Sequence, residues 1–514
     1  MNSADSIIRL HPDDNVVVTK RPLSAGESIA DQNTSIQINQ DIPFGHKVAS
    51  AAISNGDAVM KYGQNIGKAT QDIPPGEWVH SHNLTNVDKN KDEYEFSTKL
   101  VEAPKSEPRT FQGYRRPNGQ AGTRNYIAII SNVNCSASVS KSVARHFSEE
   151  RLADYPNVDG VVAFTHHGGC AMQFAGQQHQ LLNRVTGGMA RHPNIAGFVL
   201  IGLGCEQATL DYLISDQGLV QIDGFESKEQ RPPALTLQSE GGTRKTIQRG
   251  IELVDELLPI VDANRRESIP ASELIVATEC GGSDGNSGIT ANPAVGVASD
   301  LIVAQGGTSI LAETTEVIGA EHLLTQRSVS EAVGRKLLER IEWWRWYANI
   351  FGEVVDNNRS AGNAAGGLTS IAEKSLGAVA KAGSTPLREV YQYADPVTEK
   401  GLVLMDTPGF DPCSITGMVA GGAQIVLFTT GRGSCYGCKP SPSIKIATNS
   451  PMFHRMSDDM DINAGKILEN ETVDSVGREI FEKIIAVASG EPTKSEIHGI
   501  GDEEFVPWMI GPVL

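Results

Sequence analysis

Leu274-Ile-Val-Ala-Thr-Glu-Cys280-Gly-Gly-Ser-Asp284 is the stretch that most clearly indicates the fold, because a short apolar run ends there in cysteine and glycine. Three earlier apolar runs also lead to a cysteine, namely 126–130 before Cys135, 161–164 before Cys170, and 197–204 before Cys205. Such runs, flanked by glycine and without apolar–polar alternation, predict buried strands of a mostly parallel sheet. We therefore expect an α/β fold.

The four cysteines follow the carboxyl ends of predicted strands, which is where ligands bind in parallel sheets. One thiol there would need no explanation, since free cysteine is a common buried residue. Four thiols, with His166 and carboxylates nearby in the sequence, predict a site for a thiophilic metal such as iron. The alternative is four structural thiols in glycine-rich packing, and their wide spacing does not decide between the two.

Composition narrows the class of protein. A chain of 514 residues predicts roughly two to four domains. Its net charge of −18, from 44 basic and 62 acidic residues, argues against nucleic acid or an anionic membrane as a partner. Seven widely spaced cysteines argue for a reducing compartment. With no signal core and no long apolar stretch, we expect a cytoplasmic protein.

The pattern changes twice along the chain. Residues 1–87 repeat the phrase apolar-x-x-Gly-acid, as in Leu23–Glu27 and Ile73–Glu77, which predicts a small all-β domain with tight turns. A charged segment, 88–112, is typical of a linker. Strand-like and helix-like segments then alternate, which predicts parallel α/β structure. A break near 262–270 divides a middle domain, 113–265, from a C-terminal domain, 266–514. The Gly- and Ala-rich segment 360–367 is predicted to be a mobile loop.

Several short phrases occur in one order over nearly the whole chain: Gly45-His-Lys47, Lys61-Tyr-Gly63, Gly122-Thr-Arg-Asn125, His166–Cys170, Gly202–Glu206, Cys280–Asp284, Gly288–Pro293, Lys374–Gly377, Thr429–Gly433 and Asp461–Gly465. On these phrases the chain resembles the altronate and galactarate dehydratases, a family of sugar-acid hydro-lyases. The resemblance implies an N-terminal β-clip (SAF) domain, a dimerising middle domain and a Rossmann-like C-terminal domain. It also implies a homodimer and iron-dependent dehydration of a small-molecule sugar acid to a 2-keto-3-deoxy acid.

Other features leave the substrate open. His80-Ser-His82-Asn83 resembles the altronate enzymes, whereas Tyr155–Gly160 and Met460–Gly465 resemble the galactarate enzymes. Both groups usually carry a Pro-Ser-Pro-Gly-Asn-Lys loop, where this chain has Ser360-Ala-Gly-Asn-Ala-Ala. Loss of that lysine leaves room for a different hydroxy acid as substrate.

Dehydration next to a carboxylate requires a base, a group that stabilises the enediolate, and help for the departing hydroxide. We predict His166 as the preferred base or acid, with a hydrogen-bonded structural histidine as the alternative. His46 and His80, from the β domain, could reach across to the site, and the resemblance adds Lys47. Glu316, near Glu313, is a candidate general acid or ligand of a hard cation.

Metal and substrate ligands complete the prediction. The metal, as Fe²⁺, an iron–sulfur cluster or another divalent cation, is expected at Cys135, Cys170, Cys205 and Cys280. His82 could join it as part of a His-x-His pair on one strand face, and surface histidines on a turn are the alternative. Arginine and lysine suit substrate carboxylates, and the candidates, including two asparagines from the family phrases, are Arg124, Asn125, Asn292, Arg432 and Lys445.

Two other functions are compatible with parts of the pattern. The α/β alternation alone would suit a dinucleotide-dependent oxidoreductase, but no Gly-x-Gly-x-x-Gly directly follows a strand with an acidic residue about 20 positions on. The second alternative function is a non-catalytic sugar-acid binding protein that uses the β domain as its recognition module. A redox role for Cys435-x-x-Cys438 is not favoured, because the thioredoxin-type context is absent.

Overall fold

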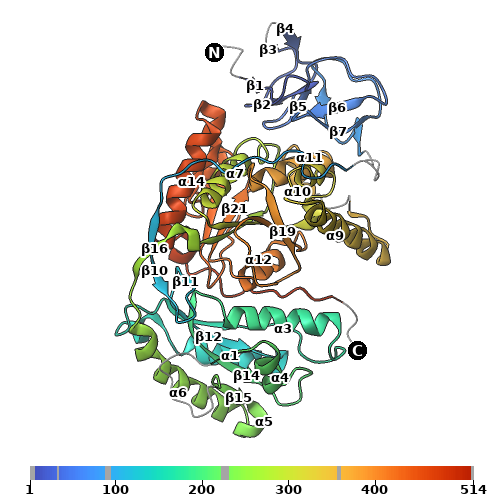
Figure 1. Cartoon of the computed structure of the whole chain (residues 1–514). Helices are drawn as coiled ribbons and strands as arrows, with labels where there is room; N and C mark the ends of the chain where they lie inside the picture. Colours follow the sequence, from blue (N-terminus) through green and yellow to red (C-terminus); the bar gives the residue numbers. More distant parts are fainter. Residues whose placement is uncertain (1–5, 32–33, 87–93, 221–230, 356–359, 511–514) are drawn as a thin grey trace.

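Three bodies of secondary structure follow one another along the chain in this computed structural model, which describes residues 6–31, 34–86, 94–220, 231–355 and 360–510 (Figure 1). The N-terminal β domain lies at one end of the molecule. The C-terminal domain, which has the longest sheet, lies next to it. The domain that is central in the sequence and is called the middle domain (here residues 121–262) lies at the other end. The predicted class, an all-β domain followed by α/β structure with a parallel sheet, is confirmed.

The N-terminal body, which we call the β module (residues 6–86), contains only antiparallel pairs. Its strands are β1 (Ile7–Ile8), β2 (Val16–Thr19), β3 (Ser28–Asp31), β4 (Thr34–Gln37), β5 (Lys47–Ala49), β6 (Ala58–Lys61), β7 (Gln64–Ala69), β8 (Trp78–Val79) and β9 (Leu84–Thr85). The repeated phrase forms its turns, since Gly26, Gly56 and Gly76 have φ of 81°, 87° and 82°. Glycine adopts this left-handed region at no steric cost.

The middle domain is built on a four-stranded parallel sheet in the order β13-β12-β14-β15. The strands are β12 (Tyr126–Ser131), β13 (Gly160–Phe164), β14 (Ile195–Gly202) and β15 (Ala234–Thr236). The helices are α1 (Ala137–Arg145), α2 (Glu149–Leu152), α3 (Gln177–Ala190), α4 (Leu210–Asp216), α5 (Leu237–Glu240) and α6 (Thr243–Asp262). β12 is buried along its whole length, as expected for a strand covered on both faces.

The C-terminal domain carries a seven-stranded parallel sheet in the order β19-β20-β18-β17-β21-β22-β23. Its strands are β17 (Ile275–Cys280), β18 (Thr308–Leu311), β19 (Leu387–Tyr391), β20 (Gly401–Met405), β21 (Ile425–Thr430), β22 (Ser443–Ala447) and β23 (Ile462–Asn463). The helices are α7 (Ala291–Ala304), α8 (His322–Thr325), α9 (Glu331–Ile350), α10 (Ala361–Ala365), α11 (Ile371–Val379), α12 (Asp411–Ala420), α13 (Ser450–Arg455), α14 (Val473–Ala488) and α15 (Lys494–Ile497). The largest core joins apolar side chains of this domain, from strands such as β20 and β21 and from α12, to side chains of β12, β13 and α3 in the middle domain.

A short antiparallel sheet joins the two α/β domains. β10 (Thr110–Arg115) pairs with β11 (Ala121–Gly122) and with β16 (Glu267–Pro270), so the strands that enter and leave the middle domain lie side by side (Figure 1). Of the predicted linker, residues 88–93 lie outside the described residues. Residues 94–109 contain neither helix nor strand, and the Tyr94 hydroxyl donates to Glu321 at 2.6 Å, which ties this segment to the C-terminal domain.

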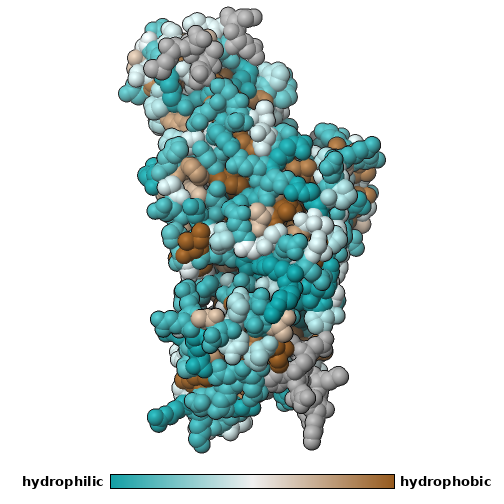
Figure 2. Space-filling view, turned by 90° about the vertical axis from the view of Figure 1, so that its left-hand side faces the viewer, coloured by the Kyte–Doolittle hydropathy of each residue, from teal (hydrophilic) through white to brown (hydrophobic). Residues whose placement is uncertain are grey.

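One local prediction is wrong. Segment 360–367, predicted to be a loop, forms helix α10, because Ser360 and Asn363 cap it reciprocally through side chain and backbone. Seen from the side of β10 and β16, the surface is mainly hydrophilic, with apolar residues in small separate groups (Figure 2). No helix among the described residues has the length and apolar character needed to cross a membrane.

Candidate functional site

The order of strands reverses between β17 and β21, so the carboxyl ends of these strands bound the crevice where a ligand is expected in an open parallel sheet. Gly281 and Gly282 follow β17, and Gly431 and Arg432 follow β21. The amides of Gly431 and Arg432 both donate to the carbonyl of Gly282, at 3.1 and 2.9 Å. Gly282 and Arg432 are exposed. The loops after β17 and β21 are therefore held together by backbone hydrogen bonds, with the exposed Arg432 at their surface.

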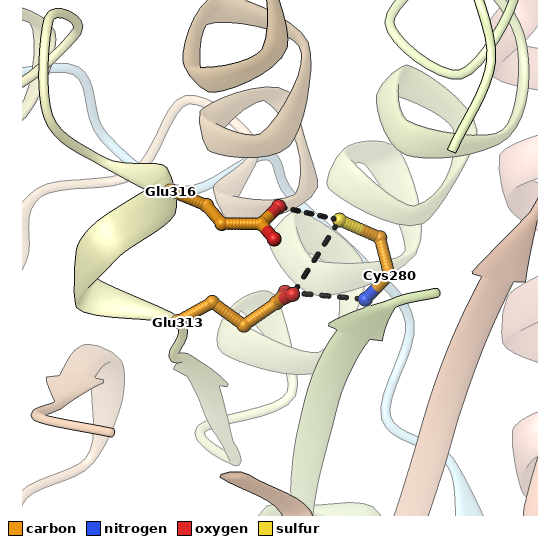
Figure 3. Close-up of side chains that lie close together, drawn as sticks. All are labelled: Cys280, Glu313 and Glu316. Atoms are coloured by element: carbon orange, nitrogen blue, oxygen red, sulfur yellow. Dashed lines mark hydrogen bonds between the residues drawn. The ribbon is translucent and has the colours of Figure 1, made fainter. Parts of the chain in front are cut away.

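A buried group of charged side chains lies at the inner end of this crevice. Cys280, the last residue of β17, points toward Glu313 and Glu316, which lie on the turn after β18 (Figure 3). Its Sγ is 3.7 Å from Glu313 Oε1 and 3.4 Å from Glu316 Oε2. Lys381 Nζ donates to Cys280 Sγ at 2.8 Å and to Glu313 at 2.6 Å, and Lys374 Nζ donates to Glu316 at 2.6 Å. We call these five residues the Cys280 cluster.

The backbone and the local charges hold this cluster in place. Glu313 has φ of 59°, which a non-glycine residue rarely adopts and which is common at functional sites. Burial raises the pKa of the Cys280 thiol, and the charge of Glu313 raises it further. Burial alone would lower the pKa of Lys381, but its interactions with Cys280 and Glu313 hold it above its ordinary value. The carboxylates thus face ammonium groups that stay charged at neutral pH.

Among the described residues, Cys280, Glu313 and Glu316 form the one group of three His, Cys, Asp or Glu side chains whose ligand atoms all lie within 4.8 Å of one another. Carboxylate and thiolate donors could in principle bind a metal ion. Here, however, Lys381 and Lys374 already occupy these donors and place two positive charges beside them. A divalent cation would be repelled, so this cluster does not fit a metal, and Cys280 leaves the predicted metal set.

Two more carboxyl groups surround the cluster. Burial, together with the charges of Glu313 and Asp411, raises the pKa of Glu279 well above its ordinary value. Its Oε2 accepts from Ser414 Oγ at 2.7 Å, and its buried Oε1 has no hydrogen-bond partner among the described residues. Asp411, the first residue of α12, lies against Gly281 and is partly exposed. The cluster and its surroundings thus hold more carboxyl groups than lysines. The excess of negative charge favours protonation of a carboxyl group.

The β module covers the outer side of the same region. Gly285 approaches Gly45 so closely that a Cβ at position 285 would lie 2.2 Å from the carbonyl oxygen of Gly45. Three side chains of the module donate to carbonyl groups at the end of α10 and just beyond it. They are His80 to Ala364 at 3.0 Å, His46 to Ala365 at 3.3 Å, and Lys47 to Gly367 at 2.8 Å. The β module is thereby fixed on the loop that follows Cys280.

The bonds of His46 define its protonation state. Trp78 Nε1 donates to His46 Nδ1 at 3.1 Å, so Nε2 carries the hydrogen that reaches Ala365. Burial lowers the pKa of His46 to about 4. The ring is therefore neutral near pH 7, with both nitrogens engaged. His80 is engaged in the same way, by Ser81 and Ala364, whereas His82 is exposed, so the predicted His-x-His metal pair gains no support.

An ion-pair triad lies beneath these histidines. Lys47 Nζ is 2.9 Å and Lys61 Nζ 2.8 Å from the carboxylate of Glu373, and all three side chains are buried. Burial would raise the pKa of Glu373, but the two lysines hold it below its ordinary value. Lys47, predicted as catalytic, is thus paired across the contact between the β module and α11.

The other three predicted thiols lie in the middle domain. Cys135, Cys170 and Cys205 follow β12, β13 and β14, which are neighbours in one sheet, and all three are exposed. Desolvation raises the pKa of Cys170, and the charges of Cys135 and Cys205 raise it further, so the three thiols lie near one another. The structure therefore brings three of the four predicted cysteines together and places Cys280 in a different sheet.

His166 lies close to this group at the end of β13. It is buried, its Nδ1 accepts from the amide of Gly168 at 3.1 Å, and its Nε2 has no hydrogen-bond partner among the described residues. Burial lowers the pKa of His166 to about 4, so the ring is neutral at pH 7. The predicted base thus belongs to the middle-domain cysteines and not to the Cys280 cluster.

Three family models match consecutive parts of the chain: an altronate/galactarate dehydratase SAF domain over residues 5–87, a D-galactarate dehydratase/altronate hydrolase second domain over 113–262, and a D-galactarate/altronate dehydratase C-terminal domain over 271–513. Altronate dehydratase of Bacillus subtilis is 36% identical, over 96% of both chains. The altronate dehydratase of Escherichia coli is 34% identical over 95% of this chain and 96% of its own. The galactarate dehydratase (L-threo-forming) of Escherichia coli is 38% identical, over 94% and 93%.

The chain belongs to the altronate/galactarate dehydratase family. It is therefore an enzyme of the hydro-lyase class. The resemblance seen in the sequence motifs is confirmed, and the β module is the SAF domain of this family.

Several residues predicted to bind substrate instead have structural contacts in this dehydratase-family chain. Arg124 pairs with Glu496 at 2.7 Å and donates to the carbonyls of Thr123 and Val487, so its guanidinium joins the middle and C-terminal domains. Asn125 bonds within the middle domain, to Arg116, Asn157 and Val261. These buried contacts use the polar groups that a substrate carboxylate or hydroxyl would need.

The C-terminal candidates divide in the same way. Asn292 bonds to Gly377 and Thr429, and the buried Lys445 donates to the carbonyl of Tyr436 at 3.0 Å. The exposed side chain of Arg432 makes no hydrogen bond or ion pair with any described residue. Arg432 is thus the predicted substrate ligand whose guanidinium remains available at the crevice.

Sequence reasoning missed Lys381, Lys374 and Asp411 as site residues. Lys374 stood in a family phrase, but nothing near Lys381 indicated that its side chain returns to the end of β17. Asp411 carried a usable signal, because Pro412 at the second helical position predicts that a helix begins there. A helix that begins soon after β20 places its first residue at the carboxyl edge of the sheet.

Proposed function

We propose that this enzyme dehydrates a hexonate or hexarate, of the altronate or galactarate type, to a 2-keto-3-deoxy acid. The observation that carries the proposal is identity of 34–38% over nearly the whole chain to proteins named as altronate and galactarate dehydratases. The carboxyl ends of β17 and β21 are consistent with it, since Arg432 after β21 is exposed and burial raises the pKa of Glu279 on β17. A sugar acid needs both a cationic ligand and a proton acceptor.

Arg432 is the group that we assign to the substrate carboxylate. A guanidinium binds a carboxylate through two parallel hydrogen bonds, which fixes its orientation. Arg432 is exposed, and its side chain forms no hydrogen bond or ion pair with a described residue, so the guanidinium can accept a ligand from the solvent side. The predicted acid Glu316 is buried and paired with Lys374. It would act on the substrate through the electrostatic field of the Cys280 cluster and not by direct contact.

Iron binding is the second part of the proposal, and the middle-domain thiols are the residues that fit it. Exposed thiols at adjacent strand ends offer the soft donors that iron accepts. One tetrahedral ion with metal–sulfur bonds of about 2.3 Å would hold three sulfurs about 3.8 Å apart. Cys135, Cys170 and Cys205 are not all within 4.8 Å of one another, which favours an iron–sulfur cluster. When bound, iron would supply Lewis-acid chemistry to a hydroxyl or carboxylate group that reaches these thiols.

His166, in the loop after β13 that also carries Cys170, is buried, and its ring is neutral at pH 7. The homodimer and the cytoplasmic location expected from the sequence stay predictions. So does the identity of the sugar acid, because α10 occupies the position where the family phrase has its lysine-containing loop.

The test is turnover of the anaerobic, iron-reconstituted enzyme against a panel of aldonates and aldarates, with detection of the 2-keto-3-deoxy product. Product from altronate or galactarate would support the proposal and decide the subgroup. Product only from another hydroxy acid would retain the reaction and change the substrate. No product from any acid, with iron bound, would contradict the proposal.

A further inference from the structure

Arg432 combines a free side chain with a firmly held backbone. Its amide donates to the carbonyl of Gly282 at 2.9 Å, and the carbonyl of Gly431 accepts from Asn449 Nδ2 at 3.1 Å. Both polar groups of the peptide between Gly431 and Arg432 are therefore engaged. The guanidinium is exposed and makes no hydrogen bond or ion pair with a described residue. The backbone is thus fixed in a position from which the side chain can reach a ligand.

Asp284 lies against the same peptide. A Cβ at Gly431 would lie 2.2 Å from Asp284 Cγ and 2.4 Å from its Oδ1, so the carboxylate packs directly on the backbone that precedes Arg432. Asn449 Nδ2 donates to Asp284 Oδ2 at 3.1 Å as well as to the carbonyl of Gly431. The carboxylate of Asp284 therefore orients the amide group that holds the Gly431 carbonyl.

Uncharged groups hold Asp284 itself in place. Thr448 Oγ1, which follows β22, lies 3.0 Å from both carboxylate oxygens. Ser287 Oγ and the backbone amide of Asn286, in the loop after β17, each donate to Oδ1 at 3.1 Å. The side chain is 5% exposed, and its hydrogen-bond donors among the described residues are all uncharged. Because both oxygens accept, an asparagine at position 284 would turn an N–H group toward groups that themselves donate.

We propose that Asp284 is a positioning residue that, through Asn449 and the Gly431 peptide, holds Arg432 in place for the carboxylate of the sugar acid. This proposal rests on the proposed function, in which Arg432 binds that carboxylate. Two parallel hydrogen bonds between guanidinium and carboxylate require a defined geometry. A side chain whose backbone is fixed before binding loses less freedom when the ligand arrives. Asp284 acts in this role through Arg432 and does not contact the acid.

The test measures kcat and KM of the full-length, iron-reconstituted enzyme for Asp284→Asn, Arg432→Ala and the double variant, with an acid that the wild type converts. A binding group misplaced by about 1 Å can cost about 10²-fold in kcat/KM. We expect a loss of this order in Asp284→Asn, through a higher KM with kcat nearly unchanged, because an ion pair made equally in the bound substrate and the transition state affects KM alone. In the Arg432→Ala background, Asp284→Asn should add nothing, since the guanidinium that it positions is absent.

Asn449→Ser is a second variant that tests the same link with less disturbance. Asn449 Oδ1 accepts from the amide of Met452 at 2.9 Å and so caps α13. Serine is an equally good capping residue, but it lacks the amide group that holds the carbonyl of Gly431. Asn449→Ser should therefore raise KM, and it too should add nothing to Arg432→Ala.

The matched control is Asp300→Asn. Asp300, toward the C-terminal end of α7, also accepts hydrogen bonds from uncharged groups, the backbone amides of Ser384 and Thr385 and the Ser384 hydroxyl. Its loss should lower the unfolding temperature and leave KM at the wild-type value, which separates general destabilisation from positioning.

Three results would overturn this proposal while wild-type turnover upholds the proposed function. They are additive effects on KM of Asp284→Asn and Arg432→Ala, an unchanged KM in Arg432→Ala, and an unchanged KM in Asn449→Ser. If thermal unfolding shows that Asp284→Asn is not folded at the assay temperature, Asn449→Ser decides alone. No wild-type turnover on any acid would contradict the proposed function, and this proposal with it.

Discussion

At the scale of the residue, Lys381 decides the state of the Cys280 cluster. It bonds to both Cys280 and Glu313, and its side chain is fully buried. Removing one partner of a buried ion pair leaves the other charge without compensation, and the cost of that exceeds the value of the pair itself. Lys381 therefore matters to folding as well as to the field at the crevice.

We expect Lys381→Met to lower the free energy of unfolding by about 3–5 kcal/mol, because the Glu313 carboxylate would be left buried without a cation. Urea denaturation at pH 7 would measure this. The matched control is Lys336→Met, whose pair with Glu389 is exposed and worth at most about 1 kcal/mol. Equal effects of the two variants would show that the Lys381 pair is not the buried support described here.

Strand-end reasoning found part of this site at the level of single residues. Cys280 was predicted because it follows an apolar run, and the carboxyl ends of parallel strands meet at one edge. Glu316 was predicted as a candidate acid and Arg432 as a ligand for a substrate carboxylate. Lys381 and Asp411 come from segments whose position depends on how helices pack back on the sheet. The assignment of Arg124 to substrate was unsupported, because no local pattern distinguishes an arginine that joins two domains from one that waits for a ligand.

At the scale of the element, α10 connects the β module to the crevice. Its last carbonyls accept hydrogen bonds from His46 and His80, and Glu373 on the next helix pairs with Lys47 and Lys61. Glycine and alanine in 360–367 suggested a loop, but the Ser360–Asn363 capping box outweighs their weak preferences. The strands were easier to predict, since long buried apolar runs allow few other structures.

The contact of the β module with α10 and α11 should weaken in acid. The folded pKa of His46, about 4, lies below its ordinary value of 6.5, so the unfolded state binds more protons and stability falls from pH 6.5 to 4. The pKa of Glu373 is also lowered, and its contribution is lost as pH falls below its ordinary value of 4.5. Hydrogen exchange in β5, β6 and α11 should therefore accelerate relative to the intrinsic rate of each amide between pH 6.5 and 4, before the seven-stranded sheet opens.

Glu373→Gln should produce the same acceleration at pH 7, since two buried lysines would lose their anion. Glu389→Gln, which removes a partly exposed partner of the exposed Lys336, is the control. Unchanged exchange in Glu373→Gln would mean that other contacts hold the β module.

At the scale of the whole molecule, the four predicted metal thiols belong to two domains. The sequence predicted that each of the four thiols follows a strand. It could not show that β12, β13 and β14 lie in one sheet and β17 in another. We expect Cys135→Ser, Cys170→Ser and Cys205→Ser each to lower iron content, whereas Cys280→Ser should keep it. Cys435→Ser, at another exposed thiol, is the control. Iron analysis after anaerobic reconstitution would check this, and loss of iron in Cys280→Ser alone would move the metal to the C-terminal domain.

The most direct measurement is turnover of altronate and galactarate deuterated at the carbon next to the reacting carboxylate, followed by NMR with the iron-loaded enzyme. The account predicts a 2-keto-3-deoxy acid from at least one of them, with loss of the label and a slower rate than for the unlabelled acid. Absence of any keto acid from both substrates, with iron bound and the protein folded, would contradict it.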